Sequence, residues 1–432
     1  MTTTATSTPP GAAARPALKP LGQALAELLA KADAAASLGE ESVATFDADG
    51  RVLARDLLAE LDVPARDNSA MDGYAVRMAD QAVAGEGAVF AVSQRIPAGA
   101  AGDTPLAAGT VARIFTGAPV PPGADAVVIQ EDSVAAGEGL VRFTARPVAG
   151  QNIRRAGEDI AQGQVVLARG RRLSAADIGL AASIGAAALP VGRRPRVALL
   201  STGDELAMPG EVAPQDLPPG GVFNSNRFFL RTLLQRLGCE VSDLGIVPDD
   251  LAATQAILAH AAQAHDVVVT SGGVSVGEED HVKPAVQALG SLELWQVAIK
   301  PGKPFAYGRL RRGPDEAAGT AHFIGLPGNP VSSYVTGLLL LRPFLLRLQG
   351  VADVLPRPVA AVAAFEWTRP DPKRRDFLRV RVEADGRLGR FGNQGSGVLT
   401  SVAWADGVID NPPGRVIQPG DTVRYIPFAE LA

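Results

Sequence analysis

Strands and helices alternate between residues 196 and 346, and this alternation restricts the fold more than any other feature of the chain. Residues 196–202 (RVALLST) are apolar and β-branched, as in a buried strand. Residues 226–238 repeat apolar side chains with the 3.6-residue period of a helix, for which Ser225 or Asn226 is the expected cap. Further strands are predicted at 240–246, 266–270, 292–299 and 321–325, and further helices at 250–264, 281–289 and from Pro330. Such alternation predicts a doubly wound α/β domain built on a parallel sheet.

Each predicted strand ends in a loop that is rich in glycine or in charged side chains. The loops are STGDE (201–205), VPDD (247–250), TSGGVSVGEED (270–280), IKPGKP (299–304) and GLPGNP (325–330). Ligands of open α/β sheets bind at the carboxyl ends of the strands. We therefore expect these five loops to share one site, although GLPGNP is equally consistent with a plain strand-to-helix connection.

The loop 270–280 carries the most chemistry of the five. Gly272 and Gly273 would let the backbone approach a phosphate, and Ser271 and Ser275 offer hydroxyl groups. The three acidic residues at 278–280 offer hard oxygen ligands for a divalent cation. Taken alone, the loop is equally well explained as a glycine turn that leads into an acidic helix N-terminus.

Charge balance at these loops predicts a metal ion. Lys300 and Lys303 favour an anionic ligand, although an exposed turn with incidental lysines is the alternative. The carboxylates of Glu205, Asp249 and Asp280 would repel such a ligand unless a cation lies between them. Mg²⁺ held by one or two carboxylates and by substrate phosphates would remove the conflict. The residues thus predict a Mg²⁺-dependent site for a phosphorylated or nucleotidyl ligand, without specifying the reaction.

The flanking regions read as β structure. Short apolar runs separated by Gly and Pro between residues 87 and 143 predict a small β domain, and a period of two returns after Gly350. Two polar loops, 62–77 and 152–160, are consistent in isolation with a solvated turn and with a surface ion-pair cluster. The fold class expected is multidomain α/β, with a central α/β domain, an inserted β domain, an elongated linker domain and a C-terminal barrel-like β domain.

Composition excludes several classes of protein. A formal charge of −5 without a basic block argues against a nucleic-acid partner. The single cysteine, Cys239, excludes an internal disulfide and favours the cytoplasm. The Thr-, Ala- and Pro-rich start predicts a disordered leader up to Pro20 rather than a signal peptide. The apolar run 335–346 is too short to span a membrane.

Seven motifs, in consistent order, resemble the family of molybdopterin molybdenumtransferases, which includes the gephyrin E domain. They are DNSAMDGYAVR (67–77), RIFTGAPVPPGADAVV (113–128), NIRRAGEDI (152–160), STGDE, TSGGVSVGEED, AIKPGKP and GLPGNPVS. The resemblance implies Mg²⁺-dependent insertion of molybdate into adenylylated molybdopterin, with release of AMP. It also implies a homodimer whose cleft is shared between subunits, and contact with other cofactor-biosynthesis proteins.

The resemblance further implies domain boundaries and site residues. The domains would be a leader (1–20), an elongated domain (21–62 with 155–193), an inserted β domain (63–154), the catalytic α/β domain (194–350) and a C-terminal β domain (354–432). The catalytic residues implied are Asp72, Thr116, Asp159, Glu205 and Asp249, with Asp280 and Glu205 as metal ligands. The substrate and molybdate contacts implied are Ser271, Gly272, Gly273, Ser275, Lys300, Lys303, Pro304, Arg379 and Ser396.

One position departs from the family pattern, because Gln296 stands where some relatives carry a lysine. Two alternative functions fit the sequence less well. An adenylyltransferase resembles only 194–345, and it would not explain the flanking β regions. A binding scaffold would not need the intact set of carboxylates and lysines.

Overall fold

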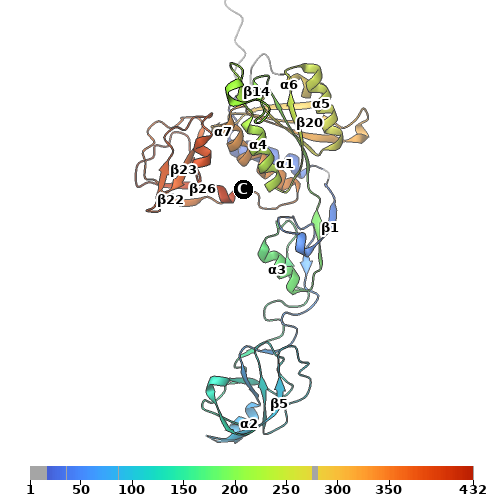
Figure 1. The fold of residues 1–432 in the computed structure, drawn as a ribbon, viewed down its shortest axis with the longest axis vertical. Coiled ribbons are helices and arrows are strands. Elements are labelled where there is room, and N and C mark those ends of the chain that lie inside the picture. The colour runs from blue at the N-terminus through green and yellow to red at the C-terminus, as the bar shows by residue number, and fades with distance from the viewer. Residues whose placement is uncertain (1–16, 36, 86, 275–280, 432) are drawn as a thin grey trace, which may run out of the picture. The chain divides into compact units, whose positions relative to one another are not determined.

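The computed structural model describes residues 17–431 except 36, 86 and 275–280. The chain forms two compact units (Figure 1). The larger comprises residues up to 41, 50–52 and 192–432, and the smaller comprises 42–49 and 53–191. The predicted leader is too long, because the main-chain N–H of Lys19 donates to Gln296 O at 2.7 Å and helix α1 starts at Leu21.

A six-stranded sheet forms the centre of the larger unit. Its strands, in order, are β16 (Glu240–Val247), β13 (Arg196–Thr202), β17 (Val267–Ser271), β21 (Thr320–Leu326), β20 (Pro304–Arg311) and β18 (Gly290–Gln296). The first four are parallel, as predicted, but β20 is antiparallel to both of its neighbours. Residues 304–311 were not predicted as a strand. Because β20 reverses direction, β18 runs parallel to β17 and delivers residues 297–303 to the carboxyl edge.

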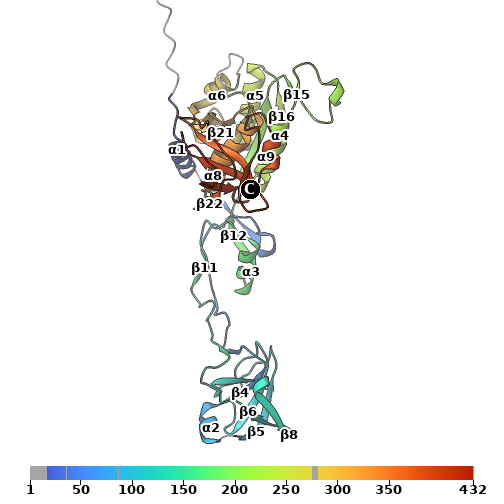
Figure 2. The same ribbon diagram turned by 90° about the vertical axis from the view of Figure 1, so that its left-hand side faces the viewer.

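Helices cover both faces of this sheet, as a doubly wound fold requires (Figure 2). Val197 and Leu199 of β13 face one core, and Ala198 and Leu200 face the other. The first core is covered by α1 (Leu21–Asp33), α4 (Ser225–Arg236), α7 (Pro330–Thr336) and α8 (Arg342–Leu348), and the second by α5 (Leu251–Ala264) and α6 (Val282–Leu289). Helix α1 packs on α8 and is grouped with this unit, whereas the elongated domain was predicted to begin at residue 21.

Judged only by its length and composition, the helical stretch Pro330–Leu348 could cross a membrane. It contains α7, a π-helical turn at Gly337–Leu341 and α8. However, 83% of its most apolar window is buried inside the protein, where it forms part of the first core.

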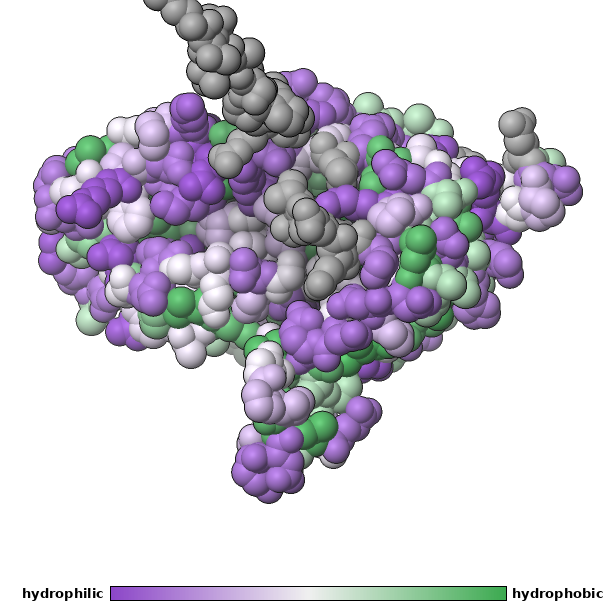
Figure 3. Space-filling model, turned by 90° about the horizontal axis from the view of Figure 1, so that it is seen from above, coloured by the Kyte–Doolittle hydropathy of each residue, from purple (hydrophilic) through white to green (hydrophobic). Residues whose placement is uncertain are grey.

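On the face seen in Figure 3, the apolar side chains are scattered among hydrophilic ones.

The C-terminal β region shares a core with the α/β region. Its sheet has the order β19 (Ile299–Lys300), β23 (Arg375–Val382), β25 (Gly407–Asn411), β26 (Thr422–Pro427) and β22 (Val359–Val362), and β24 (Leu388–Arg390) pairs with β23. Phe377, Val408 and Ile426 lie in the same hydrophobic cluster as Phe344 of α8. Strand β19 belongs to the segment IKPGKP, so this segment connects the two sheets.

The smaller unit contains the inserted β domain as a six-stranded sheet. The order is β7 (Ala126–Ile129), β4 (Gly73–Val76), β6 (Thr110–Ile114), β5 (Val89–Ile96), β9 (Leu140–Phe143) and β8 (Ser133–Gly137), with α2 (Met78–Val83) beside it. The remaining elements of this unit are β2 (Leu57–Leu58), β3 (Asn68–Ser69), β10 (Ile153–Arg154), β11 (Val165–Leu167) and α3 (Ala175–Ser183). Strands β1 (Glu40–Ala44) and β12 (Ala188–Gly192) cross the division between the units.

A buried histidine at the amino edge of the main sheet makes stability depend on pH. His322 is 7% exposed and bonds Tyr307 Oη through Nδ1 at 2.9 Å. Burial, reinforced by Arg309 and Arg312 against the opposing effect of Asp266, lowers the pKa of His322 to about 4. Because the unfolded chain protonates first, the stabilising contribution is complete above about pH 6.5 and is lost as pH falls toward 4.

We expect the free energy of unfolding to fall by about 3 kcal/mol from this group between pH 7 and pH 4. Denaturant unfolding of the intact chain at several pH values measures the loss. His322→Gln should flatten the profile between pH 6.5 and 4.5, whereas His260→Gln, on the exposed side of α5, should leave it unchanged. A profile that His322→Gln does not alter would contradict the assignment.

Candidate functional site at the carboxyl edge of the sheet

The strand registers bring the predicted loops together at one edge of the main sheet. Ser271, the last residue of β17, pairs with Ser201 on one side and with Leu326 on the other. The loops that follow these strands enclose a cavity of about 790 Å³. Its lining includes the predicted site residues Glu205, Asp249, Ser271, Gly272, Gly273 and Pro304. Ser275 and Asp280, together with the acidic pair 278–279, lie outside the described residues.

Two glycines after β17 have conformations that other residues rarely adopt. Gly272 has a φ of +97° and Gly273 a φ of +67°. A Cβ at Gly273 would overlap the side chain of Val282, and one at Gly272 would lie 3.0 Å from Thr202 O. Backbone conformation and packing against Val282 and Thr202 therefore require glycine at both positions, and both glycines line the cavity.

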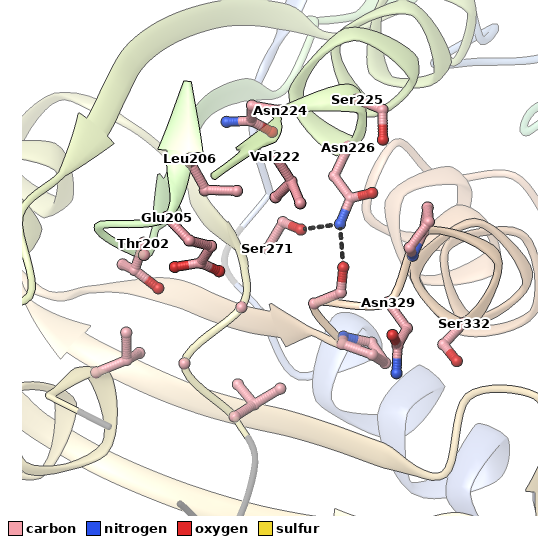
Figure 4. Close-up of a pocket in the computed structure, with 18 of the residues that line it drawn as sticks. Thr202, Glu205, Leu206, Val222, Asn224, Ser225, Asn226, Ser271, Asn329 and Ser332 are labelled. Atoms are coloured by element: carbon pink, nitrogen blue, oxygen red, sulfur yellow. Dashed lines mark hydrogen bonds between the residues drawn. The ribbon is translucent and has the colours of Figure 1, made fainter. Parts of the chain in front are cut away.

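Asn226, which was expected as a helix cap and not as a site residue, ties two of these loops together. Nδ2 of Asn226 donates to Ser271 Oγ at 2.8 Å and to Gly328 O at 2.7 Å (Figure 4). The expected cap role of Ser225 or Asn226 is wrong, because Asn224 caps α4 by accepting the main-chain N–H of Arg227. Asn226 thus lies inside the first turn, where its side chain can turn toward the cavity.

Two carboxylates in the lining of the cavity could bind a cation. Glu205 and Asp249 both line the cavity, and Asp249 Oδ2 accepts the main-chain N–H of Asp204. Two carboxylates next to a phosphate-binding loop fit Mg²⁺, which is commonly held by one or two carboxylates and by substrate phosphates. Within the described part of the chain, no group of three or more His, Cys, Asp or Glu side chains could hold a metal by itself.

The two lysines of IKPGKP occupy different surroundings. Nζ of Lys300 lies 3.9 Å from the carboxylate of Asp376, because β19 pairs with β23 in parallel. Lys303 instead lines a second cavity of about 850 Å³ together with Lys373 and Arg375. The structure therefore does not place both lysines on the wall of the first cavity, where only Pro304 of this segment lies.

Arg379 is a fully buried guanidinium on β23. It is 1% exposed and donates to Ser401 Oγ at 3.1 Å, Phe377 O at 3.1 Å and Gly395 O at 3.2 Å. Burial lowers the pKa of Arg379 to about 10, so the group stays charged at neutral pH. Among the described residues no carboxylate forms an ion pair with it, and a buried unpaired charge favours an anionic ligand.

Ser396 was expected as a substrate contact, and a different serine bonds the guanidinium of Arg379. Ser396 contributes its main-chain carbonyl, which accepts the N–H of Val331 in α7. Ser401, in the short helix α9 (Thr400–Trp404), provides the hydroxyl bonded to Arg379.

The three motifs of the smaller unit also come together. Oδ1 of Asp72 accepts both the main-chain N–H and the hydroxyl of Thr116 at 2.8 Å, and these bonds lower the pKa of the carboxyl of Asp72, a half-buried residue. Asp67 accepts the main-chain N–H of Ala156, which joins the first motif to the third. Asp159 is exposed close to this junction, and its own N–H donates to Val63 O at 3.1 Å. Arg155 Nη1 also donates to Asp67 Oδ2 at 2.5 Å, so the junction contains a surface ion pair as well.

The Thr116 contact gives a direct test of this geometry. Thr116→Val should raise the pKa of Asp72, while the remaining main-chain N–H bond keeps it below the usual value. Carboxyl titration by NMR measures the change, with the exposed Thr104→Val as the control. An unchanged Asp72 pKa would show that the hydroxyl contact is absent in solution.

Family models match most of the chain in three segments. The MoeA N-terminal region (domain I and II) matches residues 19–185. A probable molybdopterin binding domain matches residues 198–347. The MoeA C-terminal region (domain IV) matches residues 360–428.

Full-length relatives and solved structures agree with these matches. The molybdopterin molybdenumtransferase of Haemophilus influenzae is 37% identical over 391 residues, covering 89% of this chain and 93% of the relative. Molybdopterin molybdenumtransferase 2 of Mycobacterium tuberculosis is 38% identical over 385 residues, covering 86% and 90%. A crystal structure of the molybdopterin biosynthesis MoeA protein of Pyrococcus horikoshii superposes with a TM-score of 0.81 at 27% identity, covering 95% of this chain and all of that one.

Proposed function

The chain belongs to the molybdopterin molybdenumtransferase (MoeA) family and acts in molybdenum cofactor biosynthesis by molybdenum insertion, and from this premise we propose how its residues divide the reaction. The substrate proposed is adenylylated molybdopterin, and the second substrate is molybdate. The products are the molybdenum cofactor and AMP. The observation that carries the proposal is the cavity at the carboxyl edge, which combines a phosphate-binding loop with two carboxylates.

The nucleotide phosphate would bind over the loop that follows β17. Gly272 and Gly273 allow close approach of the backbone, and the hydroxyl of Ser271 lies in the cavity wall. The first turn of α4 lies on the same wall, and the N-terminus of a helix favours an anion. These groups would hold AMP through its phosphate while the phosphoanhydride is cleaved.

Glu205 and Asp249 would hold Mg²⁺ beside this phosphate, with Asp280 as the further ligand implied by the family. When bound, the ion polarises the phosphoanhydride and offsets the charge on the leaving AMP. The residues of the chain supply the remaining requirement, which is to orient the phosphate relative to the incoming oxyanion.

Molybdate would bind beside the connection between the two sheets. Lys300 enters this connection on β19, and Arg379 lies on the neighbouring strand β23 with no carboxylate ion-paired to it among residues that the structure describes. Two cations of different geometry suit a tetrahedral dianion, because the guanidinium is directional and the ammonium is not. Lys303 and Ser396 would act at the margin of this site and not within the first cavity.

A second copy of the chain would complete the site with Asp72, Thr116 and Asp159. In the smaller unit, Phe46 is 95% exposed and Leu58 is 51% exposed, and such apolar side chains favour a partner surface. We infer a homodimer that works in the cytoplasm with other cofactor-biosynthesis proteins. Separate inactivating substitutions at Asp72 and at Glu205 should then complement each other in mixed dimers.

An assay with purified components tests the proposed reaction. Adenylylated molybdopterin, Mg²⁺ and molybdate are supplied, and AMP and cofactor are quantified together. We expect one AMP for each cofactor formed, and no AMP when molybdate is omitted or when Mg²⁺ is chelated. Cofactor formation without AMP release would contradict the proposal, as would AMP release that does not depend on molybdate.

A further inference from the structure

The side-chain amide of Asn226 makes a bridge whose hydrogen-bond direction is fixed. Asn226 is 8% exposed, and its Nδ2 lies 2.7 Å from Gly328 O and 2.8 Å from Ser271 Oγ (Figure 4). A main-chain carbonyl can only accept a hydrogen bond, so the atom facing Gly328 must be the nitrogen. The amide nitrogen carries two protons, and both are therefore used in these two bonds.

This direction determines what the Ser271 hydroxyl can do. Since Ser271 Oγ accepts a hydrogen bond from Asn226, its own hydroxyl proton must point to a different acceptor. Among the described residues, Ser271 Oγ has no other hydrogen-bond partner, although its side chain is only 3% exposed. Ser271 lines the cavity, so the proton is available to a ligand there.

We propose that Asn226 is a positioning residue that fixes the Ser271 hydroxyl as a donor to an oxyanion, namely the nucleotide phosphate. The inference rests on the proposed function, because it deepens the role of the same cavity. Asn226 would also keep the loops after β17 and β21 in register, since it joins Ser271 to Gly328 across them. A fixed donor selects an ionised phosphate oxygen over a ligand group that must itself donate.

Reversing the polarity of this bridge tests the proposal. Asn226→Asp replaces the donor by an acceptor, so the Ser271 hydroxyl would turn its proton toward residue 226 and away from the ligand. We expect this variant to bind AMP about tenfold or more weakly. The measurement is calorimetric titration of the full-length protein with AMP, and thermal unfolding of each variant checks the fold.

A double-mutant cycle separates this effect from the added negative charge. In a Ser271→Ala background there is no hydroxyl to turn, so the further loss from Asn226→Asp should shrink to about threefold or less. Asn224→Asp is the matched control, because aspartate caps a helix as well as asparagine does and places the same charge on the same wall. The change in AMP affinity caused by Asn224→Asp should be equal with and without the Ser271→Ala substitution.

The possible results separate the positioning role of Asn226 from the proposed function of the cavity. A loss from Asn226→Asp that is equally large in both backgrounds, or absent in both, would overturn the positioning role alone. No AMP binding by the unaltered protein would overturn the proposed function and this inference with it. If Asn226→Asp lowers the melting temperature, Asn226→Leu replaces it in the cycle, because leucine is uncharged and similar in size. The loss of AMP affinity from Asn226→Leu must again be smaller in the Ser271→Ala background.

Discussion

Arg379→Lys should reduce kcat/KM for molybdate by about 100-fold while leaving AMP affinity within a factor of two. The guanidinium donates three hydrogen bonds at once, to Ser401 Oγ and to two main-chain carbonyls. Lysine keeps the charge but cannot reproduce this planar arrangement, and loss of a charge-assisted contact costs about 1.5–3 kcal/mol. Molybdate-dependent AMP release, measured over a range of molybdate concentrations, gives the effect.

The matched control for this prediction lies on the same strand. Arg381 is exposed on β23, so Arg381→Lys should alter neither molybdate use nor AMP affinity. Thermal unfolding distinguishes a local change from loss of the fold, because Arg379 is buried. If Arg379→Lys weakened AMP binding as much as molybdate use, the assignment of this residue to molybdate would be wrong.

Glu205→Gln should lower turnover by about 100-fold or more and raise the Mg²⁺ concentration needed for half-maximal rate. Glutamine has nearly the same shape, but it removes a charge that a hard cation requires. Glu205 lines the cavity on the loop after β13, so its side chain can reach a cation that lies beside a bound phosphate. The Mg²⁺ titration of AMP release reports both quantities.

Glu211→Gln serves as the control for Glu205→Gln, because Glu211 is an exposed acid a few residues further along the same segment. It should leave the Mg²⁺ dependence unchanged. Full turnover by Glu205→Gln at ordinary Mg²⁺ concentrations would show that this carboxylate is not a metal ligand.

The strand-end loops were predictable because buried parallel strands have a clear sequence pattern. Val267–Ser271 is a continuous apolar and hydroxyl run, and all five of its residues are buried. Strand β20 was missed because it begins with Pro304 and contains Gly308, both of which are unusual in strands. The missed strand also explains how residues 297–303 reach the same edge as the other loops.

Other features of the site depend on contacts between distant segments. Asn226 reads in sequence as a helix cap, and only packing places it between Ser271 and Gly328. Likewise Lys300 and Lys303 are neighbours in sequence, yet the pairing of β19 with β23 separates their surroundings. Sequence identifies the residue types that the chemistry needs, whereas side-chain partners are set by tertiary packing.

A crystal structure of the protein with AMP, Mg²⁺ and molybdate would test the central claim most directly. We expect the AMP phosphate within hydrogen-bond distance of Ser271 Oγ, in the cavity that Glu205 and Asp249 also line. We expect molybdate near Arg379 and Lys300. AMP bound instead in the cavity lined by Lys303, Lys373 and Arg375 would contradict the account.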